Sequence, residues 1–213
     1  MIDFYSWSTP NGRKVSIMLE ETGLPYTLHA VNIGNGDQHQ PEFRALNLNA
    51  KIPVIVDHDS GITLSESGAI LYYLAEKTDM LLPPEGEQRW RGLEWMMFQM
   101  GHIGPMFGQV HHFTKFNPGK APYAQERYLK EAKRLYQVLD TRLEARDYLV
   151  GNDSGEYSIV DIATWPWVGR FNWQTIDLND YPNVVRWYLS IAARPAVRKG
   201  WNIPPSDQPL PMP

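Results

Sequence analysis

The sequence lacks cysteine altogether. This absence excludes disulfide bonds, thiolate metal sites, iron–sulfur clusters and any nucleophilic cysteine carried by the chain itself. Any thiol chemistry must therefore use the sulfur atom of a ligand.

The sequence also lacks an excess of positive charge, since 20 Lys and Arg residues stand against 24 Asp and Glu residues. The resulting net charge of −4 argues against a protein that binds nucleic acid electrostatically. Hydrophobic residues make up 43% of the chain and charged residues 21%, a balance that argues against intrinsic disorder. The 213 residues suffice for one large domain or two small ones with a substantial core.

Clear targeting and membrane-spanning segments are also missing. Residues 1–15 carry charges and turn formers in place of the apolar stretch of a signal peptide, so we expect a cytoplasmic protein. Residues 95–114 contain no Asp, Glu, Lys or Arg and are long enough for a membrane helix. They also contain Gln99, His102 and Pro105, and this polar, helix-breaking content favours a buried, kinked helix. We therefore expect no membrane partner.

The first 80 residues alternate between strand and helix patterns. Short apolar runs bounded by turn formers predict strands at residues 2–5, 26–31, 53–57 and 62–64. Apolar residues at helical spacing, together with flanking turn signals, predict helices at residues 15–22, 41–46 and 66–77. The order βαβ, short helix, ββα indicates one small mixed α/β sheet with helices packed on it.

Proline and glycine cluster in residues 79–87, which we interpret as a linker between domains. The first domain is then residues 1–78, and residues 88–203 form a second domain that is predicted to be helical throughout. Residues 204–213 hold five prolines, so we expect an extended tail.

Within the second domain, helix patterns cover residues 90–110, 123–143 and 181–193. A further helix is predicted to start at Ser158. Ser158 and Asp161 have the spacing of a capping box, in which each side chain accepts from the backbone of the other's turn.

Three turns of the first domain carry residues suited to a small anionic ligand. The first is residues 8–12 (STPNG), between a strand and a helix. Hydroxyl and amide donors beside a helix N-terminus suit an anion such as a thiolate. Ser, Thr and Asn are also the preferred capping residues, so a purely structural cap is the alternative interpretation.

The second turn contains Lys51, Ile52 and Pro53, with the proline entering a strand. A cis Ile52–Pro53 bond would expose the backbone of Ile52 to pair with an extended ligand. Only about one X–Pro bond in twenty is cis, so the base rate favours trans and the sequence leaves the isomer open.

The third turn is residues 64–70 (LSESGAI), where another helix is predicted to begin. Ser67 and the backbone N–H groups around it suit a carboxylate, while Glu66 suits an ammonium group. One ligand that carries both ends of an amino acid would fit this pair. Ser-Glu-Ser is also typical of a helix cap, which remains the alternative.

Taken together, these features resemble the glutathione transferase family over nearly the whole chain. The resemblance is carried by Pro53 after Ile52, by Glu66 and Ser67 at a helix start, and by the Ser158–Asp161 cap. It implies a thioredoxin-like first domain, an all-helical second domain, glutathione as the cosubstrate and a homodimer.

The chain resembles most closely the bacterial nu class of that family, the disulfide-bond oxidoreductases related to a yeast nitrogen regulator. Five stretches carry this resemblance: residues 9–12 (TPNG), 36–43 (GDQHQPEF), 49–53 (NAKIP), 104–112 (GPMFGQVHH) and 122–128 (PYAQERY). It implies that Thr9 and Asn11 contact the glutathione sulfur. The other implied glutathione contacts are Gln38 and Ile52 to the peptide backbone, Glu66 and Ser67 to the γ-glutamyl end, and Lys51 and Pro53 beside them.

Arg127 is carried over as a contact to a second glutathione or to its carboxylates. The sequence departs from the commoner classes of the family, because Tyr5 lies at the end of the strand instead of in the turn. A catalytic hydroxyl from Tyr5 or Ser8 is therefore less favoured than Thr9 and Asn11.

The expected function is glutathione-dependent disulfide reduction by thiol–disulfide exchange. A free thiol with a pKa of about 8.5 is mostly protonated at neutral pH. Lowering that pKa by two units needs roughly 2.7 kcal/mol, which two hydrogen bonds to a thiolate could supply at roughly 1.5–3 kcal/mol each. The alternatives are a glutathione transferase or peroxidase acting on electrophiles and hydroperoxides, and a non-catalytic glutathione-sensing module.

The histidines of the second domain do not predict a metal site. At 100° per residue, His102 and His111 lie on opposite sides of a helix, and the adjacent His111 and His112 diverge. We therefore expect no metal cofactor.

Overall fold

The computed structural model describes residues 1–83 and 85–213, which group into two compact units. The first unit comprises Met1–Met80 together with Ala193–Leu210. The second comprises Leu81–Ala192 together with Pro211–Pro213.

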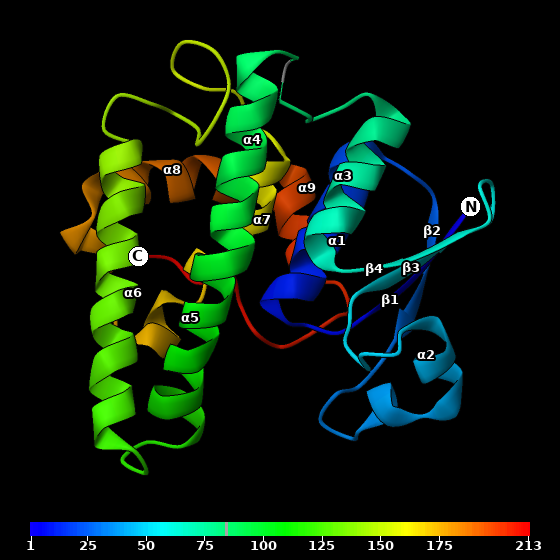
Figure 1. Cartoon of the computed structure of the whole chain (residues 1–213), viewed down its shortest axis with the longest axis horizontal. Coiled ribbons are helices and arrows are strands. Elements are labelled where there is room, and N and C mark those ends of the chain that lie inside the picture. Colours follow the sequence, from blue (N-terminus) through cyan, green and yellow to red (C-terminus); the bar gives the residue numbers. More distant parts are fainter. Residues whose placement is uncertain (84) are drawn as a thin grey trace. The chain divides into compact units, whose positions relative to one another are not determined.

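The first unit contains a four-stranded mixed sheet in the order β2-β1-β3-β4 (Figure 1). The strands are β1 (Ile2–Ser6), β2 (Tyr26–Ala30), β3 (Val54–Asp57) and β4 (Ile62–Ser65). β1 is parallel to β2 and antiparallel to β3, and β3 is antiparallel to β4. The predicted strands and the predicted thioredoxin-like order are confirmed.

The helices of the first unit are α1 (Pro10–Thr22), α2 (Pro41–Leu46), α3 (Ser67–Thr78) and α9 (Pro195–Trp201). α1 packs against both α3 and α9. It begins earlier than the apolar spacing predicted, because its first turn is polar: Arg13 and Lys14 are both buried. It ends before Gly23, whose φ of 67° is the left-handed conformation that glycine adopts without a steric penalty.

The structure differs from the predicted domain division at α9, because the sequence pattern grouped residues 88–203 together. Gly200 lies so close to α1 that an added Cβ would come within 2.6 Å of the Ile17 Cα atom. The Ser16 hydroxyl donates to the Gly200 carbonyl at 2.6 Å. The Arg13 Nε atom donates to the carbonyl of Trp201 at 3.0 Å, a contact between residues 188 positions apart. Helical periodicity reports only local spacing, so the sequence could not predict this pairing.

The second unit is helical, as predicted. Its first helical stretch passes through α4 (Glu87–Phe98), the π-helical η2 (Gln99–Ile103), α5 (Gly104–Val110) and the π-helical η3 (His111–Phe116). The remaining helices are α6 (Pro122–Arg142), α7 (Ile159–Val168), α8 (Pro182–Ala192) and the short 3-10 turns Phe171–Gln174 and Leu178–Asp180. Within the described residues, no helix is long and apolar enough to span a lipid bilayer.

The core of the second unit is aromatic, with Phe107, Tyr136, Trp165 and Trp187 all buried. The predicted capping box at the start of α7 is confirmed. The Ser158 hydroxyl accepts from the Val160 N–H at 3.2 Å, and the Asp161 carboxylate accepts from the Ser158 N–H at 3.1 Å. Residues 204–213 carry no helix or strand.

Candidate functional site

Sheet register brings the three predicted turns of the first unit to one edge. Tyr5 near the end of β1 is paired with Val54 at the start of β3, and Val54 is paired with Ser65 at the end of β4. The segments that follow β1, precede β3 and follow β4 must therefore lie beside one another.

A pocket of about 200 Å³ opens where these segments meet. It is lined by Asn11, Asn47, Lys51, Ile52, Pro53, Glu66 and Ser67. All of these except Asn47 belong to the predicted site, although the residues come from segments more than 50 positions apart.

The first segment is the start of α1. Thr9 is the N-cap of this helix, and its hydroxyl accepts from the Gly12 N–H at 3.2 Å, so the structural cap interpretation is confirmed. Capping uses one lone pair of the hydroxyl and leaves its proton as a donor. Asn11, two residues further on, lines the pocket, whereas Thr9 is not among the lining residues. Gly12 is required sterically, because a Cβ there would lie 2.3 Å from the carbonyl oxygen of Trp7.

The rival hydroxyl groups point to other partners. The Ser8 hydroxyl donates to the Pro204 carbonyl at 2.9 Å. The Tyr5 ring stacks on His29 with 4.4 Å between ring centroids and packs beside Phe43. Neither Ser8 nor Tyr5 lines the pocket.

The second segment is the loop before β3. Asn47 is buried, and its side-chain amide donates to the Lys51 carbonyl at 2.8 Å while its amide oxygen accepts from the Asn49 N–H at 3.0 Å. The Ile52–Pro53 bond is cis, the isomer that the base rate disfavoured. Sequence reasoning missed Asn47; the signal that could have found it is an Asn two residues before another Asn, typical of a side chain that closes a turn.

Gln38 lies on the short 3-10 turn Asp37–His39, outside the pocket lining. Its side-chain nitrogen lies 3.2 Å from the His39 Nε2 atom. The side chain of Lys51 is exposed at the pocket.

The third segment is the start of α3. Glu66 is the N-cap residue, with φ 69° and ψ 111°, and within the described residues its side chain makes no capping hydrogen bond. A positive φ is strained for any residue other than glycine, and such residues cluster at ligand-binding sites. Ser67 is the first residue of the helix and is buried, with 3% of its surface exposed. The capping interpretation of Ser-Glu-Ser therefore does not account for Glu66.

A buried lysine lies behind Ser67. The Lys14 Nζ atom donates to the Ser67 hydroxyl at 3.2 Å, and Lys14 is 1% exposed. Burial lowers the pKa of Lys14 to about 7, and the Glu66 carboxylate partly opposes this shift. An ammonium group thus stands next to the Ser67 hydroxyl at the end of a helix whose N–H groups already favour anions.

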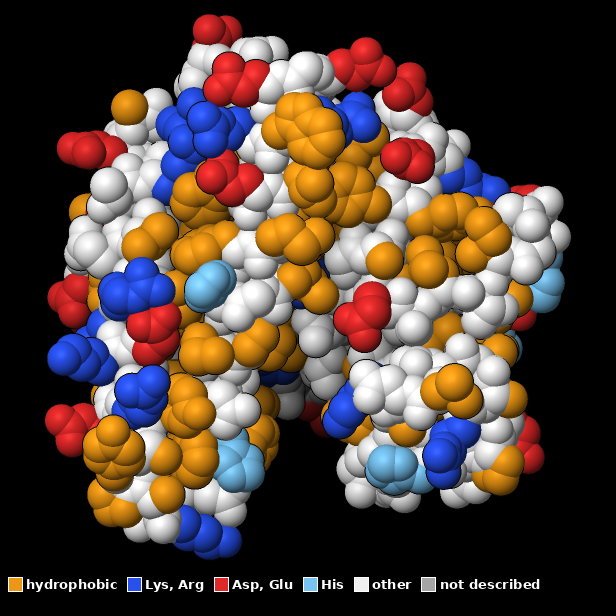
Figure 2. Space-filling model, viewed as in Figure 1, with side chains coloured by type: hydrophobic (Ala, Val, Ile, Leu, Met, Phe, Trp, Pro, Cys, Tyr) orange, Lys and Arg blue, Asp and Glu red, His pale blue; other side chains and the backbone are white. Residues whose placement is uncertain are grey.

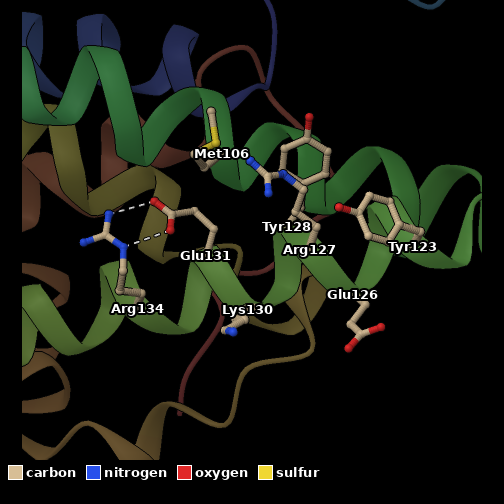
Figure 3. A pocket seen from close by; sticks show the side chains of 8 residues that line it. All are labelled: Met106, Tyr123, Glu126, Arg127, Tyr128, Lys130, Glu131 and Arg134. Carbon is tan, nitrogen blue, oxygen red and sulfur yellow. Dashed lines mark hydrogen bonds and ion pairs between the residues drawn. The ribbon is translucent and has the colours of Figure 1, made fainter.

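Arg127 lies in the second unit, on the exposed surface of α6, apart from the residues that line the first pocket. It lines a different pocket of about 670 Å³ (Figure 3), together with Met106, Tyr123, Glu126, Tyr128, Lys130, Glu131 and Arg134. In this pocket Glu131 accepts from both Nε and Nη2 of Arg134, at 2.8 and 2.7 Å. The pocket therefore combines cationic and anionic side chains with aromatic rings.

The histidines of the second unit lie apart from any cluster that could bind a metal ion: in residues 1–83 and 85–213, no group of three or more His, Asp or Glu residues is suitably placed. His111 is buried, stacks on Trp167 and lies 3.2 Å from the Gln174 side-chain nitrogen. Burial and the nearby Arg170 charge lower the pKa of His111 to about 4, so its imidazole is neutral at physiological pH.

Known proteins match both units. Residues 9–77 match the glutathione S-transferase N-terminal domain, and residues 103–195 match the glutathione S-transferase C-terminal domain. The disulfide-bond oxidoreductase YfcG of Escherichia coli is 50% identical over 201 residues, which cover 92% of each chain.

Two solved glutathione transferases have the same fold. One, from Pseudomonas putida with one glutathione disulfide bound per subunit, has a TM-score of 0.89 and 46% identity and covers 95% of this chain and 91% of its own. Another, from Burkholderia graminis with two glutathione molecules bound per subunit, has a TM-score of 0.87 and 47% identity and covers 95% of this chain and 88% of its own. The chain therefore belongs to the glutathione S-transferase family.

Proposed function

We propose that this protein is a glutathione-dependent disulfide-bond oxidoreductase whose pocket at the sheet edge binds glutathione. The observation that carries the proposal is one pocket lined by Asn11, Glu66 and Ser67 in a chain with no cysteine. The pocket offers groups for both ends of an amino acid, and the thiol must come from the ligand. The E. coli relative with 50% identity is a disulfide-bond oxidoreductase, which supports this reaction over the others of the family.

In this proposal the γ-glutamyl end of glutathione lies at the start of α3. Its carboxylate accepts from the Ser67 hydroxyl and from the N–H groups of the first turn, and its ammonium group pairs with Glu66. The backbone of Ile52, beside Pro53, pairs with the peptide backbone of the ligand, and Lys51 and Gln38 contact the remainder.

The proposed role of Thr9 and Asn11 is to stabilise the glutathione thiolate. Asn11 lines the pocket, and Thr9 retains a hydroxyl proton after capping α1. Hydrogen bonds from these groups favour the ionised sulfur and lower the pKa of the thiol, so no general base is required.

The reaction then proceeds by two exchanges. The bound thiolate attacks one sulfur of the substrate disulfide, which forms a glutathione mixed disulfide and releases the other sulfur as a thiolate. A second glutathione thiolate attacks the glutathione sulfur of that mixed disulfide, which forms glutathione disulfide and releases the second substrate thiol. Each exchange breaks one S–S bond and forms one, so the substrate gains two electrons from two glutathione molecules. We assign Arg127 to the carboxylates of the second glutathione.

The test is an assay of the purified protein with glutathione and a small disulfide, a chloronitroarene and a hydroperoxide in parallel. We expect the highest kcat/KM with the disulfide. A higher value with the chloronitroarene or the hydroperoxide would assign a transferase or a peroxidase. Glutathione binding without turnover of any substrate would assign a glutathione-sensing module.

We also propose that the protein is a cytoplasmic homodimer. Trp90, Met97 and Tyr123 on α4 and α6 are 70%, 57% and 78% exposed. Figure 2 shows hydrophobic side chains gathered over these helices of the second unit. Apolar surface of this kind is typical of an interface with a partner chain. A cytoplasmic location fits a reaction that needs reduced glutathione.

A further inference from the structure

The charge of Lys14 has no part in the reaction as described above. Long charged side chains are almost never fully buried unless they are paired, yet Lys14 is 1% exposed. It comes from the second turn of α1 and reaches the first residue of α3. A buried amine at a ligand pocket is a candidate for a functional role.

The hydrogen bond between Lys14 and Ser67 has a fixed direction when the amine is charged. An ammonium group has three donors and no acceptor, so the Ser67 hydroxyl must accept from Lys14 at their 3.2 Å separation. The proton of that hydroxyl is then a donor for another group, and Ser67 lines the pocket. A neutral amine has a lone pair, and the same hydroxyl could then donate to Lys14 instead of to a ligand.

The charges around Lys14 leave Glu66 as its main electrostatic neighbour. The Glu66 carboxylate, from the N-cap of α3, stabilises the charged amine. Charged groups on the elements packed against α1 have partners of their own: Arg13 with the Trp201 ring, Glu20 with Lys199 of α9, Glu21 with Arg194, and Lys77 of α3 with Asp57.

We propose that Lys14 is a positioning residue for the γ-glutamyl carboxylate: its buried ammonium group donates to Ser67, directs the Ser67 proton into the pocket and places a positive charge behind the ligand. This inference rests on the proposal that glutathione occupies this pocket. It adds a consequence that a structural lysine would not have, namely that ligand binding and protonation of Lys14 are coupled.

The sign of the coupling follows from the charges. In the free protein the pKa of Lys14 is about 7, so the amine is partly neutral at physiological pH. A bound carboxylate favours the charged amine and raises this pKa, so binding takes up a proton. Affinity is therefore highest below pH 7 and falls as pH rises through the pKa of the free protein, by about tenfold between pH 6 and 8 if the ligand raises the pKa by two units.

The experiment is calorimetric titration with S-methylglutathione, which keeps both carboxylates but has no ionisable thiol. Titrations at pH 7.5 in buffers of different ionisation enthalpy report the number of protons taken up. We expect net uptake by the wild type and none for an analogue whose γ-glutamyl carboxylate is a carboxamide. This comparison needs no variant.

Lys14→Met removes the charge while keeping a buried chain of similar length. We expect it to abolish proton uptake, to flatten the affinity between pH 6 and 8, and to weaken binding at pH 6 by about tenfold or more. Lys199→Met is the matched control, because Lys199 is exposed and paired with Glu20 on the same helix α1. It should retain the proton uptake of the wild type.

The two proposals fail in different ways. If S-methylglutathione binds the wild type without proton uptake, or if Lys14→Met takes up protons as the wild type does, the role of Lys14 is refuted and the glutathione site stands. If S-methylglutathione does not bind the wild type at all, the glutathione site itself is refuted, and the role of Lys14 with it.

Discussion

The backbone conformation of Glu66 predicts that binding and stability can be separated at one residue. With φ 69° and ψ 111°, this position suits glycine better than any residue with a Cβ. The Glu66 side chain is exposed and makes no capping bond in the part of the chain that the structure describes. Its loss should therefore remove few stabilising contacts. We expect Glu66→Gly to make the protein more stable and a weaker binder of glutathione.

The magnitudes follow from general values. Relief of an unfavourable backbone conformation contributes of order 1–3 kcal/mol, and the greater freedom of glycine in the unfolded chain costs about 0.5–1 kcal/mol. The net gain is about 1 kcal/mol, which raises the melting temperature by about 2–4 °C in a chain of this size. Loss of a charge-assisted hydrogen bond to the ligand ammonium group should weaken binding by about tenfold, the lower end of the range because Glu66 is exposed.

Glu66→Ala provides the control, because alanine removes the carboxylate but keeps the Cβ atom. Both variants should lose affinity equally in calorimetric titrations with glutathione, while thermal melts should show a gain for glycine alone. A melting temperature that falls in Glu66→Gly would show that the conformation is not strained. Unchanged affinity in both variants would show that Glu66 does not contact the ligand.

Three further predictions concern the thiolate, the pH dependence of stability and the assembly. Asn11→Ala should raise the pKa of bound glutathione and slow disulfide reduction at pH 7, with partial recovery at higher pH; ultraviolet titration of the thiolate checks this, and a pKa that moves in Tyr5→Phe instead would assign the role to Tyr5. Hydrogen bonds from Lys77 and Tyr73 lower the pKa of Asp57 to about 2 from its ordinary 3.8, so Asp57 stabilises the fold above pH 4 and loses this contribution as pH falls towards 2. Asp57→Asn should therefore cost up to about 2 kcal/mol at pH 7 and almost nothing at pH 2, measured by urea unfolding; an equal cost at both pH values would contradict the assigned charge. Light scattering should give twice the chain mass of 24.5 kDa, and Trp90→Glu should shift it towards one chain; a wild-type monomer at micromolar concentration would refute the homodimer.

The order of strands and helices could be predicted from the sequence because it depends on local signals. The hairpin of β3 and β4 shows alternating and β-branched residues around a turn, and the Ser158–Asp161 cap has a fixed spacing. The polar start of α1 was missed because Arg13 and Lys14 are buried by tertiary contacts that hydrophobic spacing cannot reveal.

The candidate site could be predicted only in part for the same reason. Helix starts and the X–Pro turn are visible in the sequence, so Asn11, Ile52 and Ser67 were found before their proximity was known. Asn47 acts by closing the loop through the Lys51 carbonyl, and Lys14 acts from behind Ser67. Both roles depend on which segments meet in space, and residue type alone does not contain that information.

The pairing of α9 with α1 has a consequence for biosynthesis. The glutathione-binding unit is made of two stretches separated by residues 81–192, so the ribosome must complete the helical unit before α1 can acquire its partner. Until then the face of α1 that carries Ile17 and Ser16 lacks the backbone of Gly200 against it. A nascent chain that ends near residue 80 therefore presents an open helix face, and chaperones that shield such surfaces should associate with it until α9 emerges.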